Sequence, residues 1–157
     1  MQQSTLKIRT ATDADAARLH ELHTISVRTL CKNHYRPEVI DGWLLNRSPQ
    51  GYLRPIKRGD IFVAEQDSQI VGFGEAASGV ILAVYVDPLA VGQHVGTTIL
   101  QYALQIARDG HVGPIRLEST LNAVGFYENF GFHELERITV QRGSAAVPCV
   151  LMQLAET

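Results

Sequence analysis

The chain has 157 residues, 45% hydrophobic and 19% charged, a composition typical of a single globular domain spanning residues 1–157. Its formal net charge is −2, without a block of like charges, which argues against a nucleic-acid partner because nucleic acids need a dense basic surface. There is no run of about 18 apolar residues, no apolar segment after Met1 and no cysteine framework, so we expect a cytoplasmic protein without a membrane partner.

The first part of the chain predicts a short strand and two helices. Residues 6–9 alternate between apolar and polar side chains, as in a strand. Thr12 can cap the first helix, which keeps its apolar period to about Cys31. Pro37 suits the first position of a second helix. Glycine and proline punctuate residues 46–59, so we expect a loop there.

The rest of the chain predicts a mixed α/β fold with a partly antiparallel sheet. Three strands near 60–66, 69–77 and 79–86 follow one another through short turns and should be antiparallel neighbours. A helix with a one-sided apolar stripe, near 92–109, should carry the chain to a parallel strand at 114–119. A helix at 122–130 and strands near 132–141 and 146–154 complete the domain.

An anion site is predicted where the strand 79–86 passes into the long helix. The chain turns at Asp87-Pro88 and then reads Gly92-Gln93-His94-Val95-Gly96-Thr97. A strand that feeds the N-terminus of a helix presents unpaired backbone N–H groups and the positive end of the helix dipole at one place. The alternative is a plain strand–turn–helix without a ligand.

Two blocks of this sequence resemble the GNAT acyl-CoA N-acetyltransferases. Val86-Asp87-Pro88 and Gly96 match the first block of that family, and Asn122-Ala123, Phe126-Tyr127-Glu128 and Gly131-Phe132 match the second. The resemblance is firm over about residues 69–135 and looser from 6 to 68. It implies a mixed, mostly antiparallel twisted sheet of about seven strands flanked by about four helices. It also implies acetyl-CoA as co-substrate and no metal.

The resemblance places coenzyme A along the first block. The pyrophosphate is expected on the backbone donors of the turn, and the pantetheine arm in a splay beside the strand that ends at Val86. Two residues depart from the family pattern: Val91 replaces Arg or Gln, and His94 replaces Gly. His94 either crowds the phosphates or strains its φ, or its ring donates to a phosphate oxygen. The residues expected at the cofactor are Val84, Tyr85, Val86, Val91, Gly92, Gln93, His94, Val95, Gly96, Thr97 and Asn122.

Tyr127 is the predicted catalytic acid. The family assigns protonation of the departing thiolate to the tyrosine that Tyr127 matches. A phenol with a pKa of about 10 can lend a proton to a thiol with a pKa of about 8.5 for roughly 2–3 kcal/mol. The alternative role of Tyr127 is aromatic packing beside Phe126, and Asn122 could likewise only cap its helix.

Glu75 is the predicted general base. An alkyl ammonium with a pKa of about 10.4 is almost entirely charged near neutral pH, a handicap of about 4 kcal/mol, so a group must take its proton. Glu75 lies near the end of strand 69–77 and shares a face with Phe73. The open alternatives are Glu118, His34, Tyr35 and a chain of water molecules.

Other reactive or aromatic side chains predict less. His20, His23, Cys31 and His34 lack the spacing of a zinc site, so we expect no metal. Cys31 and Cys149 have no base at motif spacing and are expected to pack in the core. The region that would contact the acceptor, including Trp43 and Tyr52, does not reveal the acceptor's identity.

These features together predict an N-acetyltransferase that moves an acetyl group from acetyl-CoA to a primary amine by direct attack in a ternary complex. The acceptor is a small molecule or a peptide, and a homodimer is left open. The alternative is a degenerate acyl-CoA-binding regulatory module without turnover, which Val91 and His94 favour and Tyr127 and Asn122 disfavour. A third alternative is a structural protein that uses the fold only as a scaffold.

Overall fold

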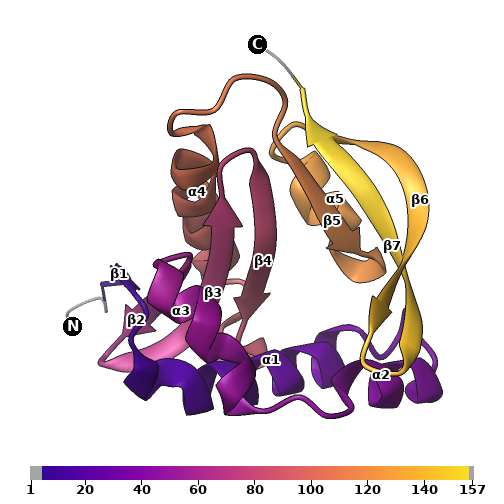
Figure 1. Cartoon of the computed structure of the whole chain (residues 1–157), viewed down its shortest axis with the longest axis horizontal. Coiled ribbons are helices and arrows are strands. Elements are labelled where there is room, and N and C mark those ends of the chain that lie inside the picture. The colour runs from indigo at the N-terminus through magenta and orange to yellow at the C-terminus, as the bar shows by residue number, and fades with distance from the viewer. Residues whose placement is uncertain (1–4, 156–157) are drawn as a thin grey trace.

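The computed structural model describes residues 5–155, which form one seven-stranded sheet with helices on both faces (Figure 1). The strand order is β1-β2-β3-β4-β5-β7-β6, and every neighbouring pair is antiparallel except β4–β5. The expected mixed, mostly antiparallel sheet is therefore confirmed. The strands are β1 (Lys7–Thr10), β2 (Ile61–Gln66), β3 (Gln69–Ala77), β4 (Val80–Val86), β5 (Arg116–Thr120), β6 (Phe132–Arg142) and β7 (Ala145–Leu154).

The described residues form five α-helices, one more than the resemblance implies. The α4 and α5 helices pack on one face of the sheet around a core that includes Ile99, Leu117 and Met152. The α1 and α3 helices cover β2 and β3 on the other face, and α2 covers β7 there. The helices are α1 (Ala16–Leu30), α2 (Pro37–Leu44), α3 (Leu53–Arg58), α4 (Val95–Arg108) and α5 (Val124–Glu128).

The expectation of a loop over residues 46–59 was wrong, because α3 and a short 3₁₀ turn at Pro49–Tyr52 lie there. Pro55 is in the first turn of α3, where a missing N–H group removes no helical hydrogen bond. Gly59 ends α3 with a φ of +80°. The proline and the glycine therefore delimit a short helix, which the burial of Ile56 secures against the sheet.

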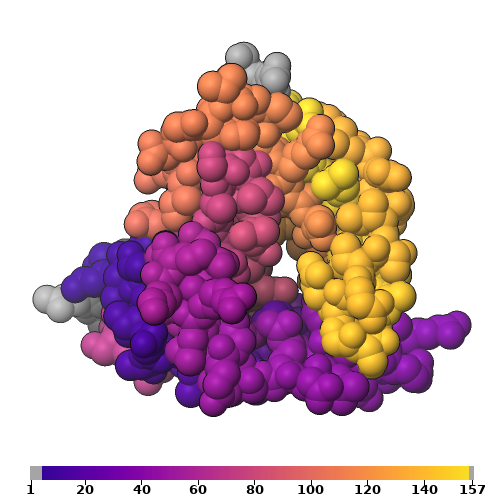
Figure 2. All heavy atoms as spheres, in the orientation of Figure 1, coloured from indigo at the N-terminus to yellow at the C-terminus, as the bar shows by residue number. Residues whose placement is uncertain are grey.

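The expected divergence of β4 from β5 is present and creates the space for a site. Within residues 5–155 the two strands pair only at Val80 with Arg116 and at Ile81 with Leu117, so from Val84 onward the edge of β4 that faces β5 has no strand beside it. The gap between the two strands widens toward α1 in Figure 1. The space-filling view is hollowed at the same place, between β4 and the β6–β7 hairpin and above α1 and α2 (Figure 2).

The glycines of β3 set how closely α4 approaches the sheet. A Cβ atom at Gly72 would lie 2.6 Å from Ile99 Cδ1, and one at Gly74 would lie 2.8 Å from Ile99 Cγ2 and 2.4 Å from a ring atom of Phe62. Such distances are too short for any side chain. The absence of side chains at both positions therefore fixes α4 against β3 and places the start of α4 beside the end of β4.

Candidate active site

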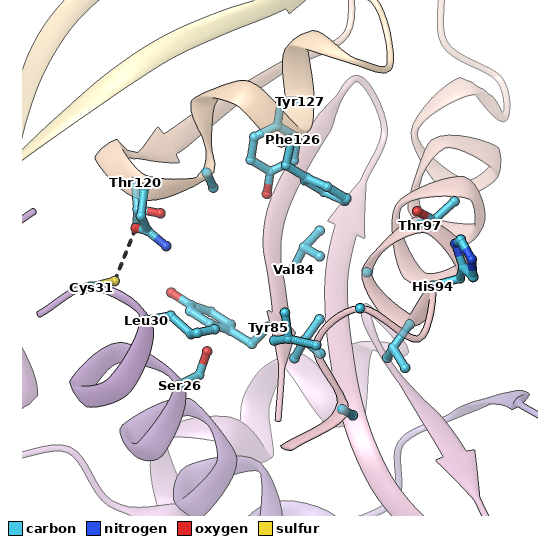
Figure 3. Close-up of a pocket in the computed structure, with 18 of the residues that line it drawn as sticks. Ser26, Leu30, Cys31, Val84, Tyr85, His94, Thr97, Thr120, Phe126 and Tyr127 are labelled. Atoms are coloured by element: carbon cyan, nitrogen blue, oxygen red, sulfur yellow. Dashed lines mark hydrogen bonds between the residues drawn. The ribbon is translucent and has the colours of Figure 1, made fainter. Parts of the chain in front are cut away.

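A cavity of about 580 Å³ occupies the divergence of β4 and β5; we call it the splay cavity (Figure 3). It brings together every predicted cofactor residue except Gln93, and it includes Tyr127. Glu75 does not line it. The lining residues are Ser26, Leu30, Cys31 and His34; Val84, Tyr85 and Val86; Ala90, Val91, Gly92, His94, Val95, Gly96 and Thr97; and Thr120, Asn122, Ala123, Phe126 and Tyr127.

The start of α4 offers free backbone donors to this cavity. The first hydrogen bond of the helix runs from the Thr98 N–H to the His94 carbonyl at 3.1 Å. Within the described part of the chain, the N–H groups of Val95, Gly96 and Thr97 have no backbone acceptor. These N–H groups lie at the positive end of the α4 dipole, so they can donate hydrogen bonds to an anion.

His94 interrupts the backbone before α4. The sequence predicted a helix from about Gly92, but α4 begins at Val95 because His94 has a left-handed φ of +63°. Only glycine adopts this conformation without a steric penalty, since other residues bring Cβ close to a carbonyl oxygen. The strained φ, one of the alternatives expected for His94 from the sequence, is therefore present. The His94 side chain is exposed.

We expect His94→Gly to raise the free energy of unfolding by about 1 kcal/mol, because it removes this strain. Denaturant unfolding of both proteins measures the change. The affinity for coenzyme A should stay within about threefold, since backbone donors and not the imidazole hold the anion. A loss of affinity of about tenfold would instead show that the ring donates to a phosphate oxygen.

Tyr127 is both a core residue and a cavity residue. Its ring packs edge-on against Phe126, with centroids 5.2 Å apart, and against Phe132 at 5.9 Å. Its hydroxyl group points into the splay cavity in Figure 3 and has no hydrogen-bond partner among residues 5–155. Burial raises the pKa of Tyr127, so the phenol stays protonated at neutral pH.

Cys31 and Asn122 face each other across the cavity wall. The Cys31 thiol donates to Asn122 Oδ1 at 3.3 Å, which joins the end of α1 to the turn before α5. Burial raises the pKa of Cys31 to about 12. A thiol that does not ionise near neutral pH is a poor nucleophile. Asn122 lines the cavity, and its contact with the cofactor stays a prediction.

The candidate general bases differ in whether they reach the cavity. His34 lines the cavity, whereas the Tyr35 hydroxyl donates to the Pro148 carbonyl and accepts from the Leu121 N–H. Glu118 lies 3.6 Å from an Arg142 nitrogen. Glu75 is half-buried outside the cavity, and burial together with the nearby Asp60 raises its pKa.

The structure also identifies cavity residues that the sequence reading missed. Ser26 and Leu30 were not predicted; with His34, an open alternative for the general base, they lie four residues apart and form one side of the cavity. That spacing places residues on one helical face, so it was a usable signal for the helical part of this segment. Trp43 and Tyr52, the expected pocket aromatics, are instead buried beside the cavity and do not line it. No group of three His, Cys, Asp or Glu side chains within residues 5–155 is arranged to hold a metal ion.

The comparison with protein families decides the assignment. The model of the acetyltransferase (GNAT) domain matches residues 31–153. The chain belongs to the GNAT acetyltransferase family. A search of curated proteins found no match.

Solved structures agree with this family on the fold. The chain is similar to a GCN5-related N-acetyltransferase of Rhodopseudomonas palustris, with 21% identity, a TM-score of 0.83 and 99% of each chain covered. It is also similar to the PaiA N-acetyltransferase of Thermoplasma acidophilum in complex with coenzyme A, at 25% identity and a TM-score of 0.77, covering 97% of this chain and 99% of that one. A putative acetyltransferase, YncA of Salmonella typhimurium, with acetyl-CoA, has 19% identity, a TM-score of 0.71 and coverage of 98% and 96%. None of the helices in the described part of this GNAT chain is long and apolar enough to span a membrane.

Proposed function

We propose that this GNAT protein transfers an acetyl group from acetyl-CoA to a primary amine by direct attack in a ternary complex. One observation carries the proposal: the free N–H groups at the start of α4 and the free hydroxyl group of Tyr127 line the same cavity. The first can bind a pyrophosphate, and the second can donate a proton to a sulfur atom.

The cofactor would lie along the exposed edge of β4. Its pyrophosphate would accept hydrogen bonds at residues 95–97, and its pantetheine arm would pair with the β5-facing edge of Val84–Val86, whose other edge pairs with β3. The complexes of the Thermoplasma protein with coenzyme A and of the Salmonella protein with acetyl-CoA support this ligand. A backbone N–H near Val84 would then stabilise the oxyanion of the tetrahedral intermediate.

Tyr127 would act when the carbon–sulfur bond breaks. The amine nitrogen attacks the thioester carbon, and the bonding electron pair leaves on the coenzyme A sulfur as a thiolate. The raised pKa of Tyr127 makes complete proton transfer costlier than ordinary pKa values imply. A strong hydrogen bond from the phenol to the developing thiolate therefore supplies most of the stabilisation, and the proton follows as the thiol leaves.

Two features of the site favour direct attack over an acyl-enzyme intermediate. Cys31, the thiol in the cavity, has a pKa of about 12, stays protonated near neutral pH and donates a hydrogen bond to Asn122 Oδ1. The cavity lining contains no serine–histidine or cysteine–histidine pair within hydrogen-bond distance in the described chain. The amine must still lose a proton, and Glu75, which lies outside the cavity, can take it only through intervening water.

The alternative is an acyl-CoA-binding module without turnover, which the strained His94 and the replacement at Val91 favour. Thermal-shift titration with acetyl-CoA, followed by a thiol-release assay over a panel of amines, separates the two. The enzyme predicts a shift and free thiol. A large shift without free thiol supports the module, and no shift with any acyl-CoA rejects both. A cytoplasmic location is part of the proposal, since Cys31 and Cys149 are free.

A further inference from the structure

A cluster of three polar side chains lies directly behind the cavity wall: Arg47, His23 and Tyr52. Arg47 Nη2 donates to His23 Nδ1 at 2.8 Å and to the Tyr52 hydroxyl oxygen at 3.0 Å. The Tyr52 hydroxyl group and His23 Nδ1 are 2.7 Å apart. The guanidinium also lies 5.6 Å from the centre of the Tyr52 ring. The cluster joins α1 to the loop between α2 and α3.

These contacts determine the protonation of His23. A guanidinium can only donate hydrogen bonds, so Nδ1 must carry a lone pair and the Tyr52 hydroxyl must also donate to it. The imidazole is therefore neutral, with its hydrogen on Nε2. Burial and the charge of Arg47 lower the pKa of His23 well below its ordinary value, in agreement with this assignment.

Arg47 differs from the other half-buried arginines in having no carboxylate partner. Arg9 pairs with Asp15 and Glu65, and Arg18 pairs with Glu21 and Asp87. No carboxylate within residues 5–155 approaches Arg47 to ion-pair distance, and both of its hydrogen-bond partners are neutral. Buried charges are normally paired, because removing them from water is costly. The charge of Arg47 is thus available to an anion from outside the described chain.

Unpaired donors strengthen this conclusion. Arg47 Nε and His23 Nε2 are both buried, and neither has a hydrogen-bond partner in the described part of the protein. His23 itself is 5% exposed. Two orphaned N–H groups in one cluster are unusual in a folded protein and require an explanation. The described residues therefore leave the donors of this cluster unsatisfied.

The ring of Tyr85 separates the cluster from the splay cavity. The His23 ring packs on the Tyr85 ring with centroids 4.1 Å apart, and Tyr85 lines the cavity. Ser26, one helical turn from His23, lines it as well. The cavity lining includes neither Asp nor Glu, so no described negative charge in it offsets Arg47. The part of the cavity beside Tyr85 and Ser26 therefore favours a negatively charged group.

From this arrangement we infer that the acceptor is an amine that carries a carboxylate, as an amino acid does, with Arg47 as the counter-charge of that carboxylate. The inference rests on the proposed acetyl transfer. His23 and Tyr52 act as positioning residues, because they hold the guanidinium on the His23 ring, which itself packs on Tyr85. Arg47 does not itself line the cavity, so the carboxylate would reach past Tyr85 to Nη1, which has no hydrogen-bond partner within residues 5–155.

Amines that share one side chain and differ only at the position of the carboxylate test this inference. The first set is phenylalanine, phenylalaninamide and phenethylamine. Two further sets repeat it with the side chains of alanine and of glutamine. Each amine is assayed with acetyl-CoA by detection of free thiol. We expect kcat/KM for the best acid to exceed that of its amide by at least about tenfold, mainly through KM. The amide has the less basic amine, so this preference cannot arise from a larger neutral fraction of the acid.

Arg47→Met should remove the preference by raising KM for the acid about tenfold or more, with KM for the amide nearly unchanged. Arg47→Lys should keep part of it. Arg54→Met is the matched control, since Arg54 is an exposed arginine on α3 and its loss changes the net charge equally. Thermal unfolding of each variant shows whether it is folded.

Equal use of acid and amide by the unmodified protein would overturn the inference, even if Arg47→Met did not fold. An unchanged ratio in folded Arg47→Met would overturn it too. Thiol release with other amines but with none of the acids would reject the inference that the acceptor carries a carboxylate, and it would leave the proposed acetyl transfer intact. Absence of any acetyl-CoA binding would instead reject the proposed function itself.

Discussion

Tyr127→Phe is expected to lower kcat by about 10- to 10,000-fold, because a positioned proton donor contributes up to about 10,000-fold. The substitution removes one hydroxyl group that makes no hydrogen bond within residues 5–155, and it keeps the ring that packs against Phe126 and Phe132. The fold and the KM for acetyl-CoA should therefore change little. Steady-state thiol release and a thermal melt of the variant measure both quantities.

Tyr102→Phe is the matched control for this variant. Tyr102 is a half-buried tyrosine on α4 whose ring packs on Phe62 at 4.6 Å, and it does not line the cavity. Its loss of a hydroxyl group should leave kcat within about twofold, since no proton donor is lost. If Tyr127→Phe retains full turnover, the phenol has no part in the reaction, and Tyr127 is only a core residue.

Gly96→Glu is expected to weaken acetyl-CoA binding by about 100-fold. It places a carboxylate at the start of α4, where repulsion between unit charges about 5 Å apart is worth about 3 kcal/mol at an effective dielectric constant of about 20. Isothermal titration of the folded variant measures the dissociation constant. Because the interaction is electrostatic and partly exposed, the loss should become smaller at high salt.

Two further substitutions at Gly96 separate charge from volume. A Cβ atom there would lie 3.4 Å from Phe126 Cζ and 3.5 Å from Val86 Cγ2, which are ordinary contacts, so Gly96→Ala should fold and bind with less than about a tenfold loss. Gly96→Gln introduces a side chain of nearly the size of glutamate without its charge. Its affinity for acetyl-CoA should lie between the affinities of Gly96→Ala and Gly96→Glu. Normal binding by Gly96→Glu would mean that the diphosphate lies elsewhere.

Most of the fold, and the part of the site formed by β4, the start of α4 and the segment around Tyr127, could be predicted from local sequence patterns. The meander of β2, β3 and β4, the apolar stripe of α4 and the motif around Tyr127 each depend on residues close in sequence, whose periodicity or turn chemistry is explicit. The α3 helix was missed because proline and glycine suggested a loop, although they stand at its two ends. Only burial of Ile56 against the sheet distinguishes the two readings.

The sequence alone determined that a strand–turn–helix with free backbone donors and a nearby phenol exists, because those groups belong to contiguous segments. Tertiary structure decided which distant side chains join them. Arg47 reaches His23 across 24 positions of sequence, and Cys31 reaches Asn122 across 91. It also left Glu75 outside the cavity and gave His94 its left-handed backbone. Such contacts depend on how helices and strands pack around the diverging β4 and β5, and no local pattern encodes that packing.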